Sequence, residues 1–380
     1  MRTIKHIFVL FVMAIVACND GYIDDINAVD PGPDQASPTI SFSNLTDTVA
    51  IPFTLVETDL VINFTVSDDI ELANVVVDFN GENVGSFNTF IDYRNLDGTV
   101  TIEALGVGNH TVNITATDLS GKETSSTVDF LLTNEYFPLA GEIFYMPFEG
   151  GEFEDIISEA SATPSGDPGF VEGVFGSAVE FNAQNSSYLI FPANEEIAGL
   201  SNFTISFWTF VDFIDEDENG GIDGILGLVN LSHSNNFWGN IDLFIENNSN
   251  PTDGARMRLH FANDGIDTWI TDVENQPNIF GRWSYHVVVY NDETKSFTYY
   301  INGDQRTSAD AAWDTGLAFQ DAERVIMGCV QFQTDPSSTS ATGAQEWASY
   351  LTGEIDEVKI FNRVLSESEI QALFNANNPN

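Results

Sequence analysis

Basic residues and cysteines are both scarce in this 380-residue chain. Only 12 lysines and arginines stand against 58 aspartates and glutamates, which gives a formal net charge of −46. A surface this acidic repels phosphate backbones, so we expect no nucleic-acid partner. The two cysteines are Cys18 and Cys329. Cys329 lies in an apolar stretch and is predicted to be an inert buried thiol.

Long apolar runs are also lacking, since a membrane-spanning helix needs about 20 residues. The run at 7–16 follows Arg2 and Lys5 and has the proportions of a signal-peptide core. Residues 15–18, Ile-Val-Ala-Cys, resemble the lipobox of bacterial lipoproteins. The resemblance implies a signal peptide over 1–17 and acyl chains on the Cys18 thiol, which anchor stably at about 0.8 kcal/mol per buried methylene. An ordinary signal peptide is the alternative.

Apolar and aromatic residues are plentiful: 43% of the chain is hydrophobic and 12% aromatic, so large cores can form. Residues 18–37 are polar and broken by prolines, which predicts a flexible tether. Residues 38–134 alternate with period two, and turn signals separate the runs, which predicts a β-sandwich. Its closing stretch, 106–128, resembles bacterial immunoglobulin-like modules, so we interpret this unit as an immunoglobulin-like spacer. The turn signals are Asn80-Gly81, Asp97-Gly98 and Ser120-Gly121.

Residues 137–380 are predicted to form a second β-rich unit. Alternation and aromatic content indicate strands at 203–209, 283–290, 296–302 and 353–361. Asn302-Gly303 is typical of a hairpin turn. One short C-terminal helix is expected after a capping box of Ser366 and Glu369, with an apolar stripe of Ile370, Leu373 and Phe374.

Ordered sequence landmarks run through this second unit from about Phe144 to Phe374. They are Phe148-Glu-Gly, the segment 173–181, Phe-Thr-Ile-Ser-Phe-Trp at 203–208, Trp-Ser-Tyr-His-Val-Val from 283, Tyr-Tyr-Ile-Asn-Gly at 299–303, and 353–370. Together they resemble the LamG-like (concanavalin A-like lectin/glucanase) family. The resemblance implies an all-β jelly-roll sandwich, in a family that includes glycan-binding modules and is related to glycoside hydrolases.

The chain departs from the catalytic pattern of related glucanases, which carry an E-x-D-x-E strand. Glu354 and Asp356 begin the motif, but position 358 is Val, and alternation predicts that Glu357 points to the opposite face. A retaining hydrolase needs two carboxyl groups about 5 Å apart. We therefore predict a non-catalytic protein, with a glycoside hydrolase or polysaccharide lyase as the less favoured alternative.

Two candidate calcium sites are present. Asp215, Asp217, Asn219 and Asp223 stand at positions 1, 3, 5 and 9 of a calcium-loop pattern with glycine at position 6, although position 12 is Leu226. The alternative is a solvated acidic loop. The family resemblance implies a second structural cation site between the first and last strands, at Glu149 and Asp356.

Glycan-binding residues are expected on one strand and among the tryptophans. Arg256, Arg258 and His260 share the outward face of a strand and could bind carboxylate, sulfate or hydroxyl groups. The alternative is that they offset nearby carboxylates such as Asp242 or Glu246. Candidate stacking platforms, each of which could instead be packing, are Trp238, Trp269, Trp313 and Trp347.

The sequence thus predicts a lipoprotein at the outer membrane of a Gram-negative bacterium, exposed at the cell surface. Its expected partners are a polysaccharide, the membrane through the N-terminal lipid, and an outer-membrane glycan importer. Calcium is the expected structural cofactor. The alternative function is an adhesion module that recognises protein.

Overall fold

The structure, a computed structural model, describes residues 34–272, 278–340 and 343–376. The chain divides into two units, residues 1–135 and 136–380. The predicted signal peptide, Cys18 and most of the predicted tether lie outside the described residues. None of the helices in the described ranges is long and apolar enough to cross a membrane.

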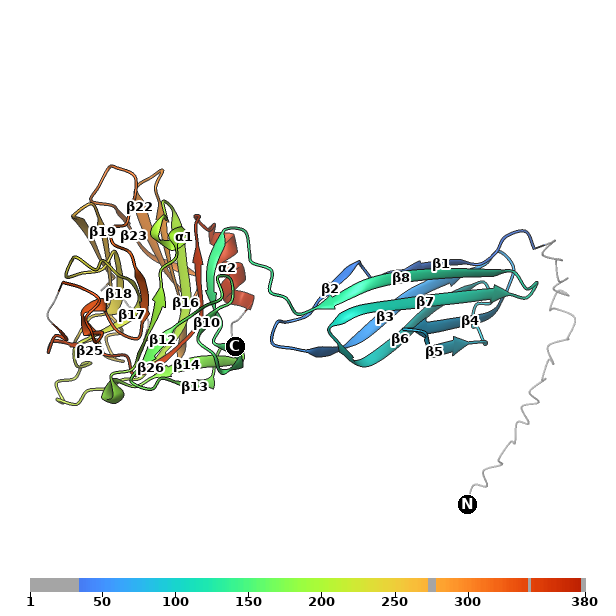
Figure 1. Cartoon of the computed structure of the whole chain (residues 1–380), viewed down its shortest axis with the longest axis horizontal. Helices are drawn as coiled ribbons and strands as arrows, with labels where there is room; N and C mark the ends of the chain where they lie inside the picture. The colour runs from blue at the N-terminus through green and yellow to red at the C-terminus, as the bar shows by residue number, and fades with distance from the viewer. Residues whose placement is uncertain (1–33, 273–277, 341–342, 377–380) are drawn as a thin grey trace, which may run out of the picture. The chain divides into compact units, whose positions relative to one another are not determined.

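The first unit is a β-sandwich of two sheets, with strand orders β1-β3-β6 and β2-β8-β7-β4-β5 (Figure 1). Ile62, Phe64 and Val66 of one sheet and Val112 and Ile114 of the other meet in one core, as their alternation predicts. The strands are β1 (Thr39–Phe42), β2 (Thr48–Ala50), β3 (Glu57–Ser67), β4 (Leu72–Phe79), β5 (Glu82–Phe87), β6 (Asn95–Gly106), β7 (Gly108–Asp118) and β8 (Glu123–Thr133).

Two of the three predicted turns of this unit are confirmed, and one is wrong. Asn80-Gly81 joins β4 to β5 with positive φ at both residues, and Ser120-Gly121 lies between β7 and β8. Asp97-Gly98 instead lies inside β6. A Cβ at Gly98 would lie 2.2 Å from Cζ of Phe64, so this glycine makes room for a core ring.

The second unit is a sandwich of two larger sheets, each named here after one strand. The β18 sheet has the order β12 (Thr163–Ser165), β15 (Tyr188–Pro192), β24 (Arg324–Met327), β17 (Ile225–Leu231), β18 (Ile241–Ile245), β19 (Met257–Asn263), β20 (Ile266–Asp272), with β25 (Ala348–Ser349) beside β17. The β16 sheet has the order β13 (Gly169–Glu172), β14 (Ser177–Phe181), β26 (Gly353–Phe361), β16 (Phe203–Val211), β21 (Trp283–Asn291), β22 (Ser296–Ile301), β23 (Asp304–Asp310), with β9 (Glu142–Met146) beside β26.

One continuous apolar core joins the inner faces of these two sheets. Phe261 of β19 and Phe297 of β22 stack across it with ring centroids 4.0 Å apart. The remaining elements are short: β10 (Glu154–Asp155), β11 (Ala160–Ser161), α1 (Glu195–Ala198) and the 3-10 turns η1 (Glu149–Gly151), η2 (Ala183–Asn185) and η3 (Gln331–Gln333). The all-β prediction and the sandwich with one short C-terminal helix are confirmed.

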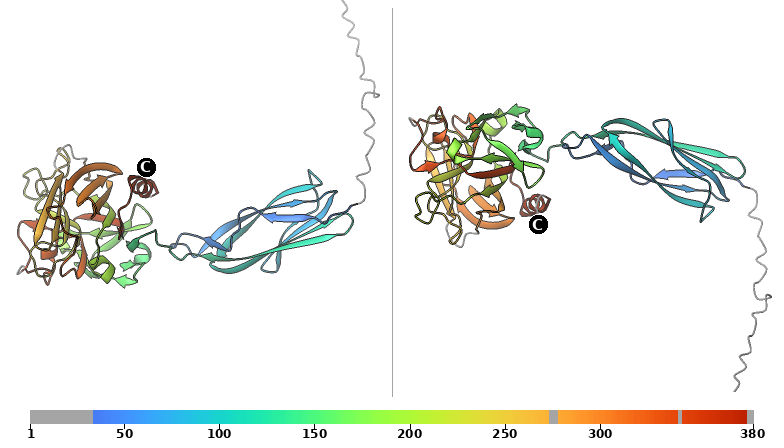
Figure 2. Two further views of the ribbon diagram at one scale, coloured as in Figure 1. Left: turned by 90° about the horizontal axis from the view of Figure 1, so that it is seen from above. Right: turned by 90° about the horizontal axis from the view of Figure 1, so that it is seen from below.

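That helix, α2 (Glu367–Ala376), covers the outer face of the β16 sheet (Figure 2). The predicted capping box is present, because the Glu369 backbone N–H donates to Ser366 Oγ at 3.3 Å and the Ser366 N–H donates to Glu369 Oε2 at 2.8 Å. The ring of Phe374 stacks on Trp208 of β16 at 5.6 Å, and Trp208 is only 2% exposed. The chain therefore seals this outer face with its own helix.

Candidate functional site

The outer face of the β18 sheet carries a hollow of about 350 Å³ lined mainly by aromatic side chains. Trp238 precedes β18, Trp269 belongs to β20, and Trp347 precedes β25. Trp238 lies 5.0 Å from Trp269 and 6.1 Å from Trp347 between ring centroids. Trp269 is 41% exposed and Trp347 is 46% exposed. We call this site the aromatic hollow; it is lined by Ile225, Trp238, Phe244, Glu246, Asn247, Arg258, Trp269 and Trp347.

Two glutamines of η3 hold the loops that carry the tryptophans. Gln331 Nε2 donates to the carbonyl of Phe237 at 3.0 Å, next to Trp238. Gln333 Nε2 donates to the carbonyl of Ala348 at 3.1 Å, next to Trp347. Between them, Phe332 is fully buried and packs on Trp238 at 5.3 Å and Trp347 at 5.1 Å. Because both loops are tied to one short turn, Trp238 and Trp347 are positioned without a ligand.

His260 is buried beneath this platform instead of being available to a ligand, so its predicted binding role is wrong. Its ring lies 4.2 Å from that of Trp269. Nδ1 is 2.9 Å from Asp242 Oδ2, and Nε2 is 3.0 Å from Asp267 Oδ1. Burial alone would lower the pKa of His260, but hydrogen bonds and charge from the two carboxylates raise it above its ordinary value. The two hydrogen bonds hold the His260 ring between β18 and β20, where it supports Trp269.

Arg258 lines the aromatic hollow, and its Nε donates to Glu246 Oε2 at 2.8 Å. The interpretation that basic residues offset carboxylates on the neighbouring strand therefore holds for Arg258 with Glu246 and for His260 with Asp242. Arg256 is exposed just before β19 and is not among the residues that line the hollow.

Trp313 was predicted as a stacking platform, and this prediction is wrong. Its side chain is 3% exposed and belongs to the core between the two sheets. Its indole N–H donates to the hydroxyl of Tyr290 at 3.0 Å, which satisfies its polar edge inside the core.

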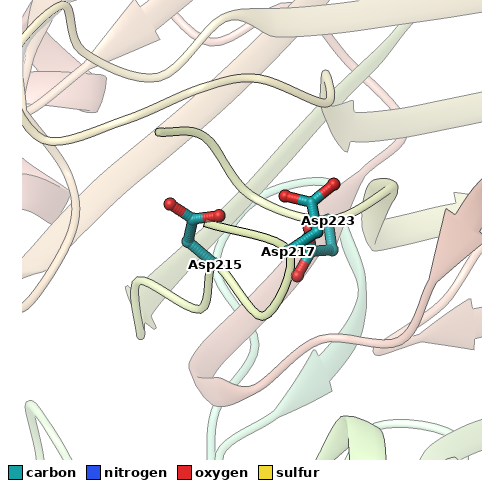
Figure 3. A group of neighbouring side chains, drawn as sticks. All are labelled: Asp215, Asp217 and Asp223. Atoms are coloured by element: carbon teal, nitrogen blue, oxygen red, sulfur yellow. The ribbon is translucent and has the colours of Figure 1, made fainter. Parts of the chain in front are cut away.

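The acidic loop lies next to the aromatic hollow. Asp215, Asp217 and Asp223 each offer a carboxylate oxygen, and these oxygens lie within 4.8 Å of one another (Figure 3). The Asn219 backbone N–H donates to Asp215 Oδ1 at 3.0 Å and folds the loop, while the Asn219 side chain donates to Asp217 Oδ2 at 2.9 Å. Three converging carboxylates are a suitable start of a calcium site, which takes six to eight oxygens.

A second hollow, of about 360 Å³, joins this loop to the aromatic one. Asp217, Asn219 and Asp223 line it, together with Glu346. Asn247 and Trp347 line both hollows, so the acidic loop and the tryptophans face neighbouring parts of one surface.

The second candidate cation pair, Glu149 and Asp356, is bound to the turn between β13 and β14. Glu149 Oε1 accepts the backbone N–H of Ser177 at 3.1 Å, and Asp356 Oδ2 accepts that of Val174 at 2.8 Å. Burial and the nearby Glu357 raise the pKa of Asp356 to about 8. These two carboxylates are thus engaged by backbone donors, and among the described residues they belong to no cluster of three metal-ligating side chains whose ligand atoms lie within 4.8 Å of one another.

The predicted orientation of Glu357 is wrong, because β26 contains a β-bulge here. Glu357 has φ 52°, and the register against β16 shifts at this point. The Glu357 carboxylate therefore shares the outer face with Asp356 and accepts the hydroxyl of Tyr145 at 2.6 Å. Both carboxylates are nevertheless buried, at 0% and 3% exposure. A buried pair cannot contact a glycan at the surface, so the bulge supplies no hydrolase site.

Sequence reasoning missed Phe244, Asn247 and the two η3 glutamines. Phe244 had a signal in the sequence, because alternation places it on the same face of Ile241–Ile245 as Asp242, where a surface strand is ordinarily polar. The glutamines had no such signal, since their role comes from a contact between distant loops. Cys329 is fully buried with its pKa raised by burial, as predicted for an inert thiol.

The second unit is thus a two-sheet β-sandwich with one sealed and one open outer face. Residues 183–371 match the family model of the concanavalin A-like lectin/glucanases superfamily. The second unit belongs to this superfamily, as the ordered landmarks predicted.

Similar proteins include the Paraclostridial mosquitocidal protein 1 of Paraclostridium bifermentans, which is 27% identical over 218 residues, 54% of this chain. The chain spans only 15% of that protein's length. The binding domain of the same protein has a TM-score of 0.48 at 20% identity, covering 62% of this chain and 52% of that chain. Domain 4 of AbnA, an extracellular arabinanase from Geobacillus stearothermophilus in complex with arabinotriose, has a TM-score of 0.42 at 15% identity, covering 62% and 99%.

Proposed function

We propose that this protein is a non-catalytic, lipid-anchored glycan-binding protein that captures polysaccharide in the aromatic hollow. The observation that carries the proposal is the convergence of three tryptophans, two of them more than 40% exposed, on one rigidly held hollow. Exposed apolar surface rimmed by polar groups marks a binding site on a soluble domain.

The chemistry of the hollow suits a sugar. The apolar face of a pyranose or furanose ring stacks on an indole, while hydroxyl groups need both donors and acceptors at the edge. Arg258 and the Asn247 amide supply donors, and the Glu246 carboxylate and the Asn247 carbonyl supply acceptors. Binding of this kind requires no acid–base pair, which agrees with the burial of Asp356 and Glu357.

The anchoring part of the proposal rests on the sequence. Lipid on Cys18 would hold the protein on the outer membrane of a Gram-negative bacterium, with the first unit as a spacer. A polysaccharide held there would be delivered to an outer-membrane glycan importer. Metabolic labelling with a palmitate analogue should mark the wild-type protein and leave a Cys18→Ala variant unlabelled. Labelling of that variant would contradict the anchor.

Calcium in the acidic loop completes the proposal as a structural cofactor. Asp215, Asp217, Asn219 and Asp223 would supply the oxygens, and the carbonyl at position 7 of the loop, Gly221, another. Since the hollow that the loop lines shares Asn247 and Trp347 with the aromatic hollow, the bound ion would fix the edge of the glycan site.

The test is affinity electrophoresis of residues 19–380 through gels that contain neutral or anionic polysaccharides. We expect retardation by at least one polysaccharide, and restored mobility when Trp269 and Trp347 are both replaced by alanine. Tyr93→Ala is the matched control, because Tyr93 is an exposed aromatic residue of the first unit. No retardation across the panel, together with enrichment of one protein in a pull-down, would support the adhesion alternative instead.

A further inference from the structure

Among the described residues that line the aromatic hollow, one is a cation and one a carboxylate, and the two are paired. Arg258 Nε lies 2.8 Å from Glu246 Oε2, across the neighbouring strands β18 and β19. The side chains of Arg258 and Glu246 are 32% and 27% exposed, so both can reach a ligand. The guanidinium that would attract an anionic sugar is therefore already neutralised within the site.

The surroundings strengthen this effect. Asp217, Asp223 and Glu346 line the adjoining hollow, and no lysine or arginine is among its described lining residues. Together with Asp215, these carboxylates outweigh the charge of one bound calcium ion, so the region stays negative with or without the ion. The whole chain carries a net charge of −46. A sulfated or carboxylated sugar entering the hollow would meet a negative potential, and it would have to displace Glu246 to reach Arg258.

An uncharged sugar meets no such penalty. The contact between Arg258 and Glu246 uses Nε and Oε2, and among the described residues no hydrogen bond is present to the two terminal nitrogens of the guanidinium or to Oε1 of the carboxylate. Both residues line the hollow, so these atoms remain available to a ligand there. Adjacent sugar hydroxyls can then donate to the carboxylate and accept from the guanidinium, while the ring stacks on an indole.

We infer that the site selects uncharged polysaccharides, and that Glu246 is the residue that rejects anionic ones by neutralising Arg258. This inference rests on the proposed function of the aromatic hollow. Selection by a repulsive group as well as an attractive surface is a common route to specificity.

The experiment compares neutral polysaccharides with their own carboxymethylated derivatives, so that the sugar and linkage stay constant. Candidate polymers are β-glucan, xylan, mannan, arabinan and starch. Wild type should bind at least one neutral polymer, and its carboxymethylated form about tenfold or more weakly at low salt. Glu246→Gln should strengthen binding of the anionic form about tenfold and change that of the neutral form less than about threefold. The gain should shrink as salt rises, since screening weakens the freed charge.

Glu293→Gln is the matched control. Glu293 is an exposed carboxylate in the turn between β21 and β22, so the variant changes the net charge equally without touching the hollow. The inference is overturned if wild type binds the two forms of its polymer equally, or if Glu246→Gln has no more effect than Glu293→Gln. If neither form shows binding that depends on Trp269, the proposed function itself fails, and the inference with it.

Discussion

Both outer faces of the second unit carry a tryptophan, but one tryptophan is buried and the other is partly exposed. Trp208 on the β16 sheet lies under helix α2, stacked on Phe374 and almost fully buried. Trp269 on the β18 sheet stands on His260 and remains 41% exposed. The same residue type serves packing on one face and is left open on the other.

This difference in burial indicates that the outer face of the β16 sheet serves stability, whereas the outer face of the β18 sheet is available for binding. Burial of a large aromatic side chain contributes several kcal/mol to folding, and the β16 sheet obtains it from the chain's own helix. The β18 sheet gains less from Trp269 and Trp347, because much of each ring stays in water. Phe332, His260 and the two η3 glutamines hold the exposed rings in position. This arrangement is expected of a preformed binding platform.

The largest effect is expected on the sealed face. Trp208→Ala should lower the free energy of unfolding by about 3–5 kcal/mol, because it leaves a cavity beneath α2. Urea denaturation followed by tryptophan fluorescence measures this loss. A change below about 1 kcal/mol would mean that the helix does not seal the face as described. Trp208→Phe, which keeps most of the contact, should lose less.

Calcium should stabilise the edge of the open face. A ligand bound only to the folded state at 100 times its Kd adds about 2.7 kcal/mol, so the melting temperature of the second unit should rise with calcium and fall in EDTA. Asp215→Asn with Asp217→Asn should abolish the response. Glu103→Gln, an exposed carboxylate of the first unit, should retain it. Identical melting in calcium and EDTA would eliminate the proposed ion.

His260 should give the open face a pH dependence. Burial lowers the pKa of His260, but Asp242 and Asp267 raise it to a net value above that of the unfolded chain. Its contribution to stability is therefore complete below about pH 6.5, the ordinary histidine pKa, and is lost as pH rises through the folded value. His260→Gln should flatten this dependence and cost about 1–3 kcal/mol, because buried Asp242 loses a charged donor. An unchanged pH profile in the variant would show that another group titrates.

The smallest effect on folding is expected for the exposed ring itself. Trp269→Ala should lower the free energy of unfolding by about 1–2 kcal/mol, less than Trp208→Ala, since 41% of Trp269 is already exposed. Comparison with Trp208→Ala under the same conditions sharpens the contrast between the faces. If the two variants lose equal free energy of unfolding, the two faces do not differ in their contribution to stability.

Local sequence patterns predicted most of the strands, because the alternation of apolar and polar residues along a strand indicates which of its faces is buried. Alternation placed Ile62, Phe64 and Val66 in the first core and Met257, Leu259 and Phe261 in the second. The errors at Gly98 and Glu357 share one cause. A close aromatic contact and a β-bulge depend on residues from other strands, which a single strand's pattern does not contain.

The sequence predicted which types of residue form the candidate site, but it predicted only in part which of these residues lie together. Trp238, Trp269, Trp347 and Arg258 were identified from the sequence, and the structure brings these four into one hollow. Trp313 has the same local context of polar and small neighbours but is buried, because the partner of its indole, Tyr290, comes from a strand 23 residues earlier. His260 alternates like a surface residue, yet Trp269 covers it from the adjacent strand.

The central claim is that the open tryptophans bind polysaccharide. The most direct test is isothermal titration of residues 19–380, as wild type and with Trp269 and Trp347 both replaced by alanine, using an oligosaccharide of whichever polymer retards the wild type. We predict an affinity loss of at least tenfold, about 1.4 kcal/mol, in a double variant that still unfolds in one transition and is less destabilised than Trp208→Ala. Equal affinity of the two proteins would contradict the account.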